Sequence, residues 1–340
     1  MDVIARSRNR ATIADVAIAA DVSRATVSRV LNNSPLVNEK TVQKVRAAAR
    51  AVNFVMNAQG RALATGRADL IAILMTEPVD ELLSDPTYAR ILRGITERLA
   101  STNYLPSIVL ATNAHQRQHA ARHFAQSRID AVIDLCPYEG MEILDTLRGS
   151  HLPVVLCGQL ENKPYEGEFS TVYSDDIVGA TLAGKFMHKL GRRNIAVIMG
   201  PKSNPASIDR LQGYEEGLAC PIPPTHIRHT GWDSQSGFAS MMSLTHSIPG
   251  IDGILAGSDR IAVGAIAALN SLGLRVPEDI SVIGFDDNPI ASSFSPALTT
   301  IHQPLLKEGK AAAQVAIDML NGAEPTTLVM DMHLVERESA

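Results

Sequence analysis

Three short helical patterns occupy the first 56 residues of the chain. In the first, apolar residues recur at i, i+3 and i+4, namely Ile13, Val16 and Ala17, which predicts one buried helix face. Residues 21–23 interrupt this period, and Ser23 is a residue type favoured at a helix N-cap. The second helix then turns three apolar residues inward: Val27, Val30 and Leu31. A third helix is predicted over residues 38–51.

The second of these helices leaves mainly hydrogen-bond donors and small side chains on its outer face: Arg24, Ala25, Thr26, Ser28, Arg29 and Asn32. Such groups suit contacts with phosphates and base edges, and an α-helix fits the width of the DNA major groove. The pattern therefore predicts a DNA-binding helix-turn-helix. The alternative is an ordinary helical hairpin in which Ser and Thr cap helices and Arg is solvated.

A further helical segment is predicted over residues 57–66, where Gly66 ends it. A segment of this length is too short to form a stable helix alone in water. A marginal helix beside a DNA-binding unit favours a segment that becomes ordered on docking.

Beyond residue 68, short apolar runs alternate with helical periods. The strand-like runs are 70–75, 107–111, 131–135, 153–157, 195–199, 253–256 and 281–285. The helical stretches include 87–100, 115–126, 176–190, 209–218, 259–272 and 305–320. Continuous apolar strands separated by helices are typical of parallel, doubly wound sheets covered on both faces, and the number of runs implies two sheets. The predicted fold class is an all-α headpiece with a hinge helix, joined to an α/β body of two such lobes.

Charge is divided unevenly between these parts. The first 67 residues carry 11 Lys and Arg against 4 Asp and Glu, while the whole chain has a net charge of −5. A basic head on an acidic body is expected when a nucleic-acid-binding module is joined to a domain of another kind. Arg6, Arg8 and Arg10 form a basic arm that either contacts phosphates or serves as a solubilising tail.

The remaining composition favours a soluble, cytoplasmic protein, since no apolar stretch approaches 18 residues and the first residues form no apolar signal core. Cys136, Cys157 and Cys220 have no C-x-x-C spacing, so free thiols are expected.

Nothing in the sequence favours an enzyme or a cofactor. Two carboxylate pairs, Asp175-Asp176 and Asp286-Asp287, have no His or Cys at metal-ligand spacing. Neither a G-x-S-x-G elbow nor a Walker A loop occurs. His115, His119 and His123 follow one helical face, for which solvation is a simpler explanation than metal binding.

Three segments carry a resemblance to a known family: T-I-A-D-V-A with V-S-R-A-T-V-S-R-V-L-N-N, then V-N-E-K-T, then N-A-Q-G-R-A-L-A-T-G. They resemble the headpiece of the LacI/GalR family of bacterial repressors, and the likeness continues over nearly the whole chain. It implies two body lobes similar to periplasmic sugar-binding proteins. It also implies a dimer whose hinge helices form on the operator and each insert a leucine, here Leu63, into the minor groove. The alternative for Leu63 is a core leucine of a linker helix.

The resemblance also implies a division of the chain and a set of DNA contacts. The expected parts are a headpiece over 1–56, a hinge over 57–67 and a body over 68–340. Within the body the N-lobe takes 68–168 and 299–325 and the C-lobe 169–298 and 326–340, with crossings near 166–171, 292–299 and 324–327. The expected DNA contacts are Thr12, Ser23, Arg24, Ala25, Thr26, Ser28, Arg29, Asn32, Asn57, Ala62 and Leu63.

Polar and aromatic residues gather where the predicted strands end, which is where ligands bind in doubly wound sheets. The family resemblance implies six effector-binding positions: Tyr88, Arg210, Trp232, Ser258, Asp286 and Gln303. Structural alternatives are core packing for Trp232, a surface ion pair for Arg210 and a helix N-cap for Asp286; an N-cap is also the favoured role of Asp259. The chain departs from common family patterns at Thr87, Ala206 and Ser258, which leaves the effector open.

The predicted function is a dimeric, effector-responsive transcription regulator that represses genes of carbohydrate uptake or catabolism. It is expected to bind double-stranded palindromic operator DNA, because a two-fold protein matches a two-fold site. There are two alternatives. One is a regulator that responds to a nucleoside or purine, and the other is a solute receptor without DNA function. The last residues show no leucine heptads that would favour a tetramer.

Overall fold

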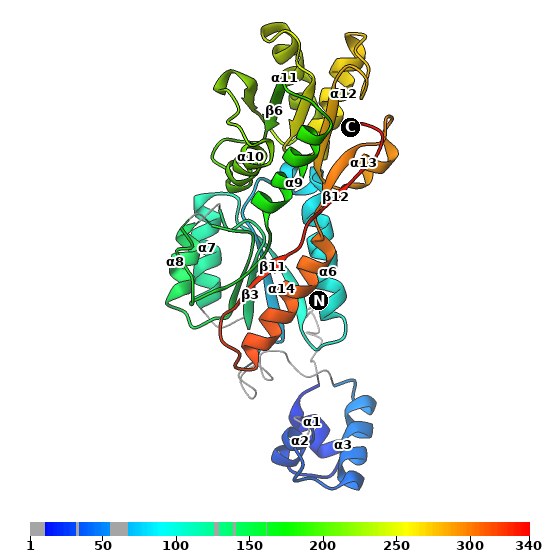
Figure 1. The fold of residues 1–340 in the computed structure, drawn as a ribbon. Helices are drawn as coiled ribbons and strands as arrows, with labels where there is room; N and C mark the ends of the chain where they lie inside the picture. Colours follow the sequence, from blue (N-terminus) through cyan, green and yellow to red (C-terminus); the bar gives the residue numbers. More distant parts are fainter. Residues whose placement is uncertain (1–10, 32–33, 55–66, 126–128, 139–140, 161) are drawn as a thin grey trace, which may run out of the picture. The chain divides into compact units, whose positions relative to one another are not determined.

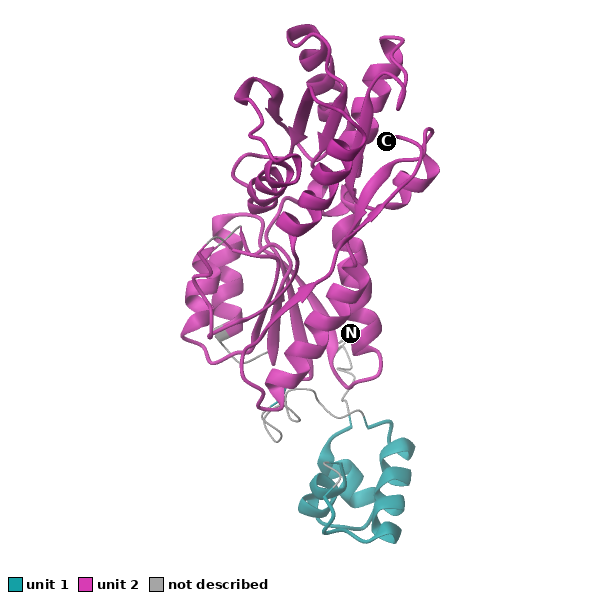
Figure 2. Cartoon of the chain, viewed as in Figure 1, with its two compact units in different colours: residues 1–68 teal, residues 69–340 magenta. Residues whose placement is uncertain are grey.

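The computed structural model describes residues 11–31, 34–54, 67–125, 129–138, 141–160 and 162–340. The chain divides into two compact units, Met1–Ala68 and Asp69–Ala340 (Figure 2). This division lies one residue after the expected start of the body. The expected hinge helix over 57–66 lies outside the described residues.

The described residues of the smaller unit form three helices, at the positions that the sequence predicts: α1 (Ile13–Ala19), α2 (Arg24–Leu31) and α3 (Glu39–Ala51). Their apolar faces meet in a small core in which Val16, Val27 and Val45 are fully buried. Ile13, expected on the inner face of α1, is 37% exposed instead.

The first sheet of the larger unit has six parallel strands in the order β11-β5-β4-β3-β1-β2. They are β1 (Leu70–Met75), β2 (Leu105–Leu110), β3 (Ala131–Asp134), β4 (Val154–Cys157), β5 (Ser170–Ser174) and β11 (Thr327–Met330). Helices α6 (Pro86–Leu99) and α14 (Leu305–Leu320) cover one face, and α7 (Ala114–Ala125) and α8 (Met141–Arg148) cover the other (Figure 1). The short α5 (Val79–Ser84) follows β1. We call this part the N-lobe.

The second sheet also has six strands, in the order β12-β10-β9-β8-β6-β7. They are β6 (Ile195–Met199), β7 (Ile227–His229), β8 (Gly253–Ala256), β9 (Ser281–Asp286), β10 (Thr299–His302) and β12 (His333–Val335). Its helices are α9 (Asp176–Lys189) and α10 (Pro205–Leu218) on one face, α11 (Ser234–Ser247) and α12 (Asp259–Ser271) on the other, α13 (Pro289–Ser293) and the 3-10 turn η1 (Pro224–His226). The edge strand β12 is antiparallel, which differs from the expected all-parallel sheet. This part is the C-lobe.

The chain crosses between the lobes three times, and the expected crossing points are wrong by several residues. The observed crossings join β5 to α9, β10 to α14, and β11 to β12. Residues 169–174 and 326–330 therefore belong to the N-lobe, and 299–302 to the C-lobe. Two of the misplaced strands, β5 and β10, are rich in hydroxyl side chains and lack the continuous apolar runs by which the other strands were recognised.

Those buried hydroxyls are accommodated by hydrogen bonds that only the fold supplies. Ser170 Oγ accepts a hydrogen bond from Thr326 N at 3.0 Å, and Thr300 Oγ1 donates to Asp259 Oδ1 at 2.5 Å. Buried polar groups are tolerated when they are paired in this way.

Helix α11 was not predicted, because its sequence S-Q-S-G-F-A-S-M-M-S-L-T-H-S is rich in weak helix formers. Close packing against α12 explains its formation. A Cβ at Gly237 or Gly264 would collide with backbone atoms of the other helix, so glycine is required at both contacts.

Within the described part of the chain, no helix is long and apolar enough to span a membrane. The same residues hold no group of three or more His, Cys, Asp or Glu side chains arranged to bind a metal. Cys136 and Cys157 are buried and Cys220 is exposed, all three as free thiols.

Candidate DNA interface and effector cleft

The expected recognition helix is α2, and its start is fixed by Ser23. The Ser23 hydroxyl accepts a hydrogen bond from Thr26 N at 3.0 Å and lies 2.9 Å from Thr26 Oγ1. The bond from Thr26 N is the capping interaction predicted for Ser23. The side chains of Arg24, Ala25 and Arg29 are exposed, and Ser28 is half-buried.

Thr12 has a capping role as well. Its hydroxyl accepts from Asp15 N at 3.4 Å while its backbone N donates to Asp15 Oδ2 at 2.7 Å, and these two bonds form a capping box at the start of α1. The hydrogen bonds from Thr12 hold the pKa of Asp15 below its usual value. The other expected DNA contacts, Asn32, Asn57, Ala62 and Leu63, lie outside the described residues.

A cleft with an empty volume of about 800 Å³, partly open to solvent, lies between the two lobes of the larger unit. Its walls come from strand ends and helix starts of both lobes, because the carboxyl ends of parallel strands meet there. All six expected effector residues line it: Tyr88, Arg210, Trp232, Ser258, Asp286 and Gln303. Thr87 and Ala206, where the chain departs from common family patterns, line it too. A concave site lined by polar and aromatic side chains suits a small ligand.

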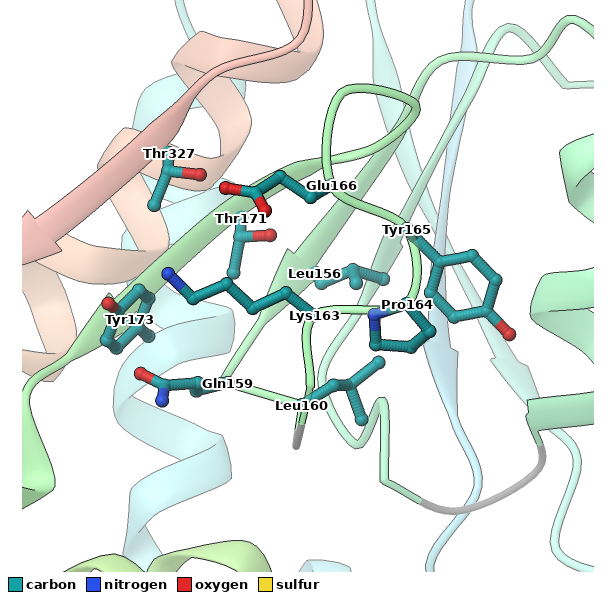
Figure 3. A pocket seen from close by; sticks show the side chains of 10 residues that line it. All are labelled: Leu156, Gln159, Leu160, Lys163, Pro164, Tyr165, Glu166, Thr171, Tyr173 and Thr327. Carbon is teal, nitrogen blue, oxygen red and sulfur yellow. The ribbon is translucent and has the colours of Figure 1, made fainter.

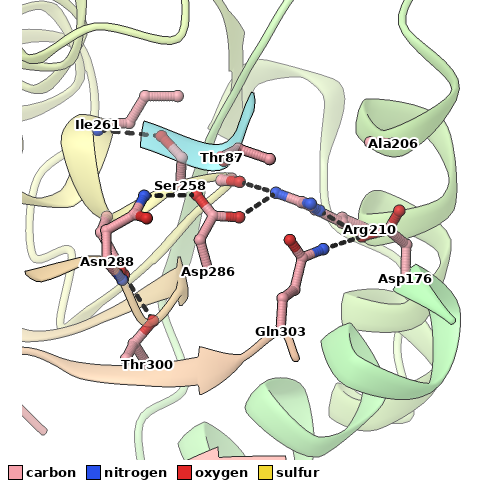
Figure 4. Close-up of polar contacts among 12 residues, drawn as sticks. Thr87, Asp176, Ala206, Arg210, Ser258, Ile261, Asp286, Asn288, Thr300 and Gln303 are labelled. Carbon is pink, nitrogen blue, oxygen red and sulfur yellow. Dashed lines mark hydrogen bonds and ion pairs between the residues drawn. The ribbon is translucent and has the colours of Figure 1, made fainter. Parts of the chain in front are cut away.

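Arg210 of α10 lies buried at the centre of this cleft rather than in a surface ion pair. Its Nε donates to Asp176 Oδ1 at 2.7 Å, and its Nη1 is 3.4 Å from Asp286 Oδ1 and also donates to the carbonyl of Gly257 (Figure 4). Burial lowers the pKa of Arg210, but Asp176 and Asp286 outweigh this effect and hold it above its usual value. A permanently charged, oriented guanidinium results.

Two aromatic rings lie close to the same guanidinium. The Phe285 ring centre is 3.8 Å from the Arg210 guanidinium carbon, and the Trp232 ring centre is 5.7 Å from it. Trp232 packs against the C-lobe core and also lines the cleft, so its two expected roles coexist. Gly200 makes room for the indole, since a Cβ there would collide with it.

Asp286 ends β9 with a backbone φ of +102°, outside the usual range for a residue with a side chain. Its Oδ2 accepts from Asn288 Nδ2 at 3.4 Å, while Asn288 is the N-cap of α13, so Asp286 caps no helix. Burial raises the pKa of Asp286 and Arg210 lowers it; the balance lies well above the ordinary value.

The prediction that Asp259 caps a helix is wrong by one residue. Ser258 is the N-cap of α12, and its Oγ accepts from Ile261 N at 3.2 Å. Asp259, at the first helical position, is fully buried and accepts hydrogen bonds from Thr300 Oγ1 and, at 2.6 Å, from Asn288 N. Burial raises the pKa of Asp259 to about 7, although these two hydrogen bonds lower it. Asp259 thus joins α12 to β10 and to the loop after β9.

The N-lobe wall carries a pair of tyrosines. Tyr88 of α6 and Tyr138, after β3, lie with their hydroxyls 2.9 Å apart, and both line the cleft. Burial is the main cause that raises the pKa of Tyr88, and the neighbouring Tyr138 is the second. The phenol of Tyr88 therefore stays neutral. Gln303 approaches from the crossing after β10 and donates to Asp176 Oδ1 at 3.5 Å.

Sequence reasoning missed several lining residues, notably Tyr138, Asp176, Ser174 and Glu308. Asp176 was noted only as half of a carboxylate pair, and Glu308 was not noted at all. Asp176 begins a helix directly after a strand, a position from which a pocket role could have been inferred. Glu308 lies inside a helical period that gives no such signal.

Two further hollows adjoin the cleft. One, of about 370 Å³, lies beneath the loop after β4 and includes Lys163, Glu166 and Thr327; it shares Gln159 and Tyr173 with the cleft (Figure 3). The other, of about 740 Å³, continues the cleft past Trp232 and Tyr138 to Glu77 and Glu81. The space open to a ligand therefore extends beyond the central part of the cleft into these two hollows.

Comparison with known proteins agrees with this architecture. The model of "Bacterial regulatory proteins, lacI family" matches residues 12–57, and that of "Periplasmic binding protein-like domain" matches residues 185–340. The HTH-type transcriptional regulator CelR of Thermobifida fusca is 33% identical over 339 residues, covering 98% of this chain and 99% of its own. The HTH-type transcriptional repressor PurR of Photorhabdus laumondii is 32% identical over 339 residues, covering 97% and 96%.

Solved structures give the same result. A CelR–cellobiose complex superposes with a TM-score of 0.76 at 31% identity, covering 97% of this chain and 100% of that one. A lac repressor dimer bound to operator and the anti-inducer ONPF gives 0.83 at 26% identity, covering 97% and 99%. With relatives above 30% identity that span both units, this chain belongs to the lacI family of bacterial regulatory proteins and is a DNA-binding transcriptional regulator, not an enzyme.

Proposed function

We propose that this regulator is a homodimeric repressor of carbohydrate uptake or catabolism genes, acting on a palindromic operator in the cytoplasm under the control of a sugar effector. The observation that carries the effector class is Arg210, fixed between Asp176 and Asp286 in the cleft and faced by aromatic rings. Vicinal hydroxyls of a sugar accept from a guanidinium and donate to carboxylates, while the ring's apolar face stacks on an aromatic side chain.

The six predicted residues then have distinct roles. Arg210 and Asp286 bind adjacent hydroxyls, Trp232 and Tyr88 contact the ring, and Gln303 and Ser258 supply further polar contacts. Ser258 contributes less than the others, because its hydroxyl already caps α12. The additional space toward Glu77 and Glu81 is compatible with a second sugar ring, and the similar regulator CelR has been solved with cellobiose.

On the DNA side, we assign base reading to the exposed side chains of α2, above all Arg24, Ala25 and Arg29. We assign minor-groove contacts to Asn57, Ala62 and Leu63. A dimer with two-fold symmetry requires an operator with the same symmetry, so we assign a homodimer and a palindrome together. The similar lac repressor has been solved as a dimer on its operator.

The test is titration calorimetry of the full chain with cellobiose, other neutral mono- and disaccharides, adenosine and hypoxanthine, in parallel with selection of bound genomic fragments. A sugar that binds and changes operator affinity supports the proposal. Binding of only the nucleoside or the purine would replace the sugar with that effector class. Absence of any selected fragment would contradict the repressor assignment.

A further inference from the structure

Glu308 is a carboxylate in the effector cleft that has no basic partner among the described residues. It lies in the first turn of α14, directly after the crossing from β10, and its side chain is about 95% buried, since 5% of the residue is exposed. One carboxylate oxygen, Oε2, accepts a hydrogen bond from Ser174 Oγ at 2.9 Å. The other, Oε1, has no hydrogen-bond partner among the described residues, although Glu308 lines the cleft.

The other acidic residues that line the cleft each lie beside a basic side chain. Asp176 and Asp286 share Arg210, and Asp85 lies 3.6 Å from Arg260. Arg210 is the only basic residue among those described as lining the cleft. One unpaired carboxylate therefore remains.

A largely buried carboxylate without a basic partner is unfavourable, and a ligand that donates a hydrogen bond to its second oxygen relieves that penalty. An acidic ligand would instead place like charges together in a site of low dielectric. The charge of the cleft thus favours a ligand rich in neutral hydroxyls and opposes one that carries a carboxylate or phosphate.

Resting on the sugar-responsive function proposed above, we infer that Glu308 is a specificity-determining effector residue: Oε1 accepts a hydrogen bond from a hydroxyl of an uncharged sugar and excludes acidic sugars. Glu308 lies where the chain crosses between the two lobes. Ser174 ends β5 at one lobe crossing and Glu308 follows another, so their hydrogen bond joins two of the three crossings at the floor of the cleft.

A pH effect provides a second signature. Burial raises the pKa of Glu308 to about 7, with Ser174 opposing this and the negative charge of Asp176 adding to it. Asp176 of α9 and the Cys157 thiol of β4 are the titratable groups that interact with it from neighbouring elements. A sugar hydroxyl favours the ionised carboxylate, so sugar binding releases a proton and affinity rises with pH through this range.

The experiment compares the full-length protein with Glu308→Gln, using cellobiose against cellobionate and glucose against glucuronate by calorimetry at pH 6, 7 and 8. In the parent protein we expect the neutral sugar to bind at least about tenfold more tightly than its acid. In Glu308→Gln this preference should fall several-fold, the affinity for the neutral sugar should weaken, and the rise of affinity with pH should flatten.

Two controls separate specificity from stability. Glu324→Gln makes the same change at an exposed position of the N-lobe and should behave as the parent. Ser174→Ala keeps the carboxylate but removes its hydrogen bond, so it should move the pH profile to higher pH without abolishing it.

The outcomes are distinguishable. If the parent binds a sugar but Glu308→Gln keeps the same neutral-to-acid preference and pH profile, Glu308 is structural and the inference is overturned. If the parent binds acidic sugars best, the inference is also overturned while a sugar effector stands. If the parent binds none of the sugars, both the sugar effector and this inference fail.

Discussion

At the scale of single residues, neighbours decide the role of each side chain more than its type does. Ser258 and Asp259 are adjacent and equally good helix caps by composition, yet Ser258 caps α12 while Asp259 holds Thr300 and Asn288 together. Arg210 is likewise fixed by two carboxylates, a carbonyl and two rings. Such a group binds ligand with little loss of side-chain entropy, which favours affinity.

Replacing Arg29 should alter base preference. The side chain is exposed on α2, and arginine can make a two-pronged contact with guanine. Arg29→Ala should weaken specific binding by roughly 1–3 kcal/mol and relax preference at one base pair of each half-site. Selection from randomised half-sites measures this, with Arg50→Ala, an exposed position on α3, as the matched control. An unchanged preferred sequence would remove Arg29 from the base-reading residues.

Asp134 should make the stability of the body depend on pH. It ends β3, its Oδ2 is buried without a hydrogen bond, and burial raises its pKa to about 7 against the hydrogen bond from Cys136 N. Because the folded-state pKa is raised, the stability due to this group is present below the unfolded value and is lost as pH rises toward 7.

Asp134→Asn should therefore stabilise the body by on the order of 1–3 kcal/mol at pH 8, with a gain that shrinks steadily toward pH 4. Chemical unfolding at pH 4, 6 and 8 measures this, and Asp331→Asn at an exposed position is the control. A gain that does not vary with pH would contradict the argument.

At the scale of elements, apolar periodicity explains which segments were recognised. Strands such as β1 and β6 are continuous apolar runs and were predicted nearly to the residue. In β5 and β10, hydroxyl side chains replace much of the apolar signal, so the sequence pattern predicts connections there instead of strands. Their buried hydroxyls are satisfied by residues far away in the sequence, which a local pattern cannot reveal.

The segment over 57–66 belongs to the same scale, because Gly60 and Gly66 weaken its predicted helix. Leu63→Ser should preserve the dimer and effector affinity but abolish most specific operator binding and DNA bending, since an apolar wedge kinks the duplex. Gel-shift bending assays measure this, with Leu83→Ser, at a position 82% exposed in the body, as the control. Normal operator affinity in Leu63→Ser would make Leu63 a packing residue.

At the scale of the whole body, contacts between the lobes fix an arrangement of the two lobes that a ligand can change. Arg260 of the C-lobe lies 3.6 Å from Asp85 of the N-lobe, and Arg90 of α6 donates to the carbonyls of Asp286 and Asp287. Asp85 and Asp286 also line the cleft. A ligand that contacts both walls can therefore favour one arrangement of the lobes, to the extent that it binds that arrangement more tightly.

Operator and effector should consequently change each other's affinity by the same factor, typically ~5–150-fold. Asp286→Asn should raise the dissociation constant of the effector by at least about tenfold and leave operator affinity without effector within a few-fold. Asparagine tolerates the positive φ at this position, so the substitution tests hydrogen bonding rather than backbone strain.

Calorimetry with and without operator measures both quantities, and Asp80→Asn at an exposed site is the control. Equal sugar affinity in the two states would show that the sugar is no effector. Loss of folding in Asp286→Asn would mean that this residue supports the structure rather than the ligand.

The sequence by itself determined the helix-turn-helix, the two doubly wound lobes and the gathering of polar and aromatic residues at strand ends, and its resemblance to the family implied which six of them line the cleft. Periodic apolar faces, helix caps and strand-end residues are local features, because each depends on residues that are close together in the sequence. Only the tertiary structure decided where the chain crosses between lobes, which of Ser258 and Asp259 caps α12, and that Glu308 faces the cleft without a basic partner. Those features depend on burial and on partners distant in sequence, such as Ser174 for Glu308, and packing of the two lobes is what brings such residues together.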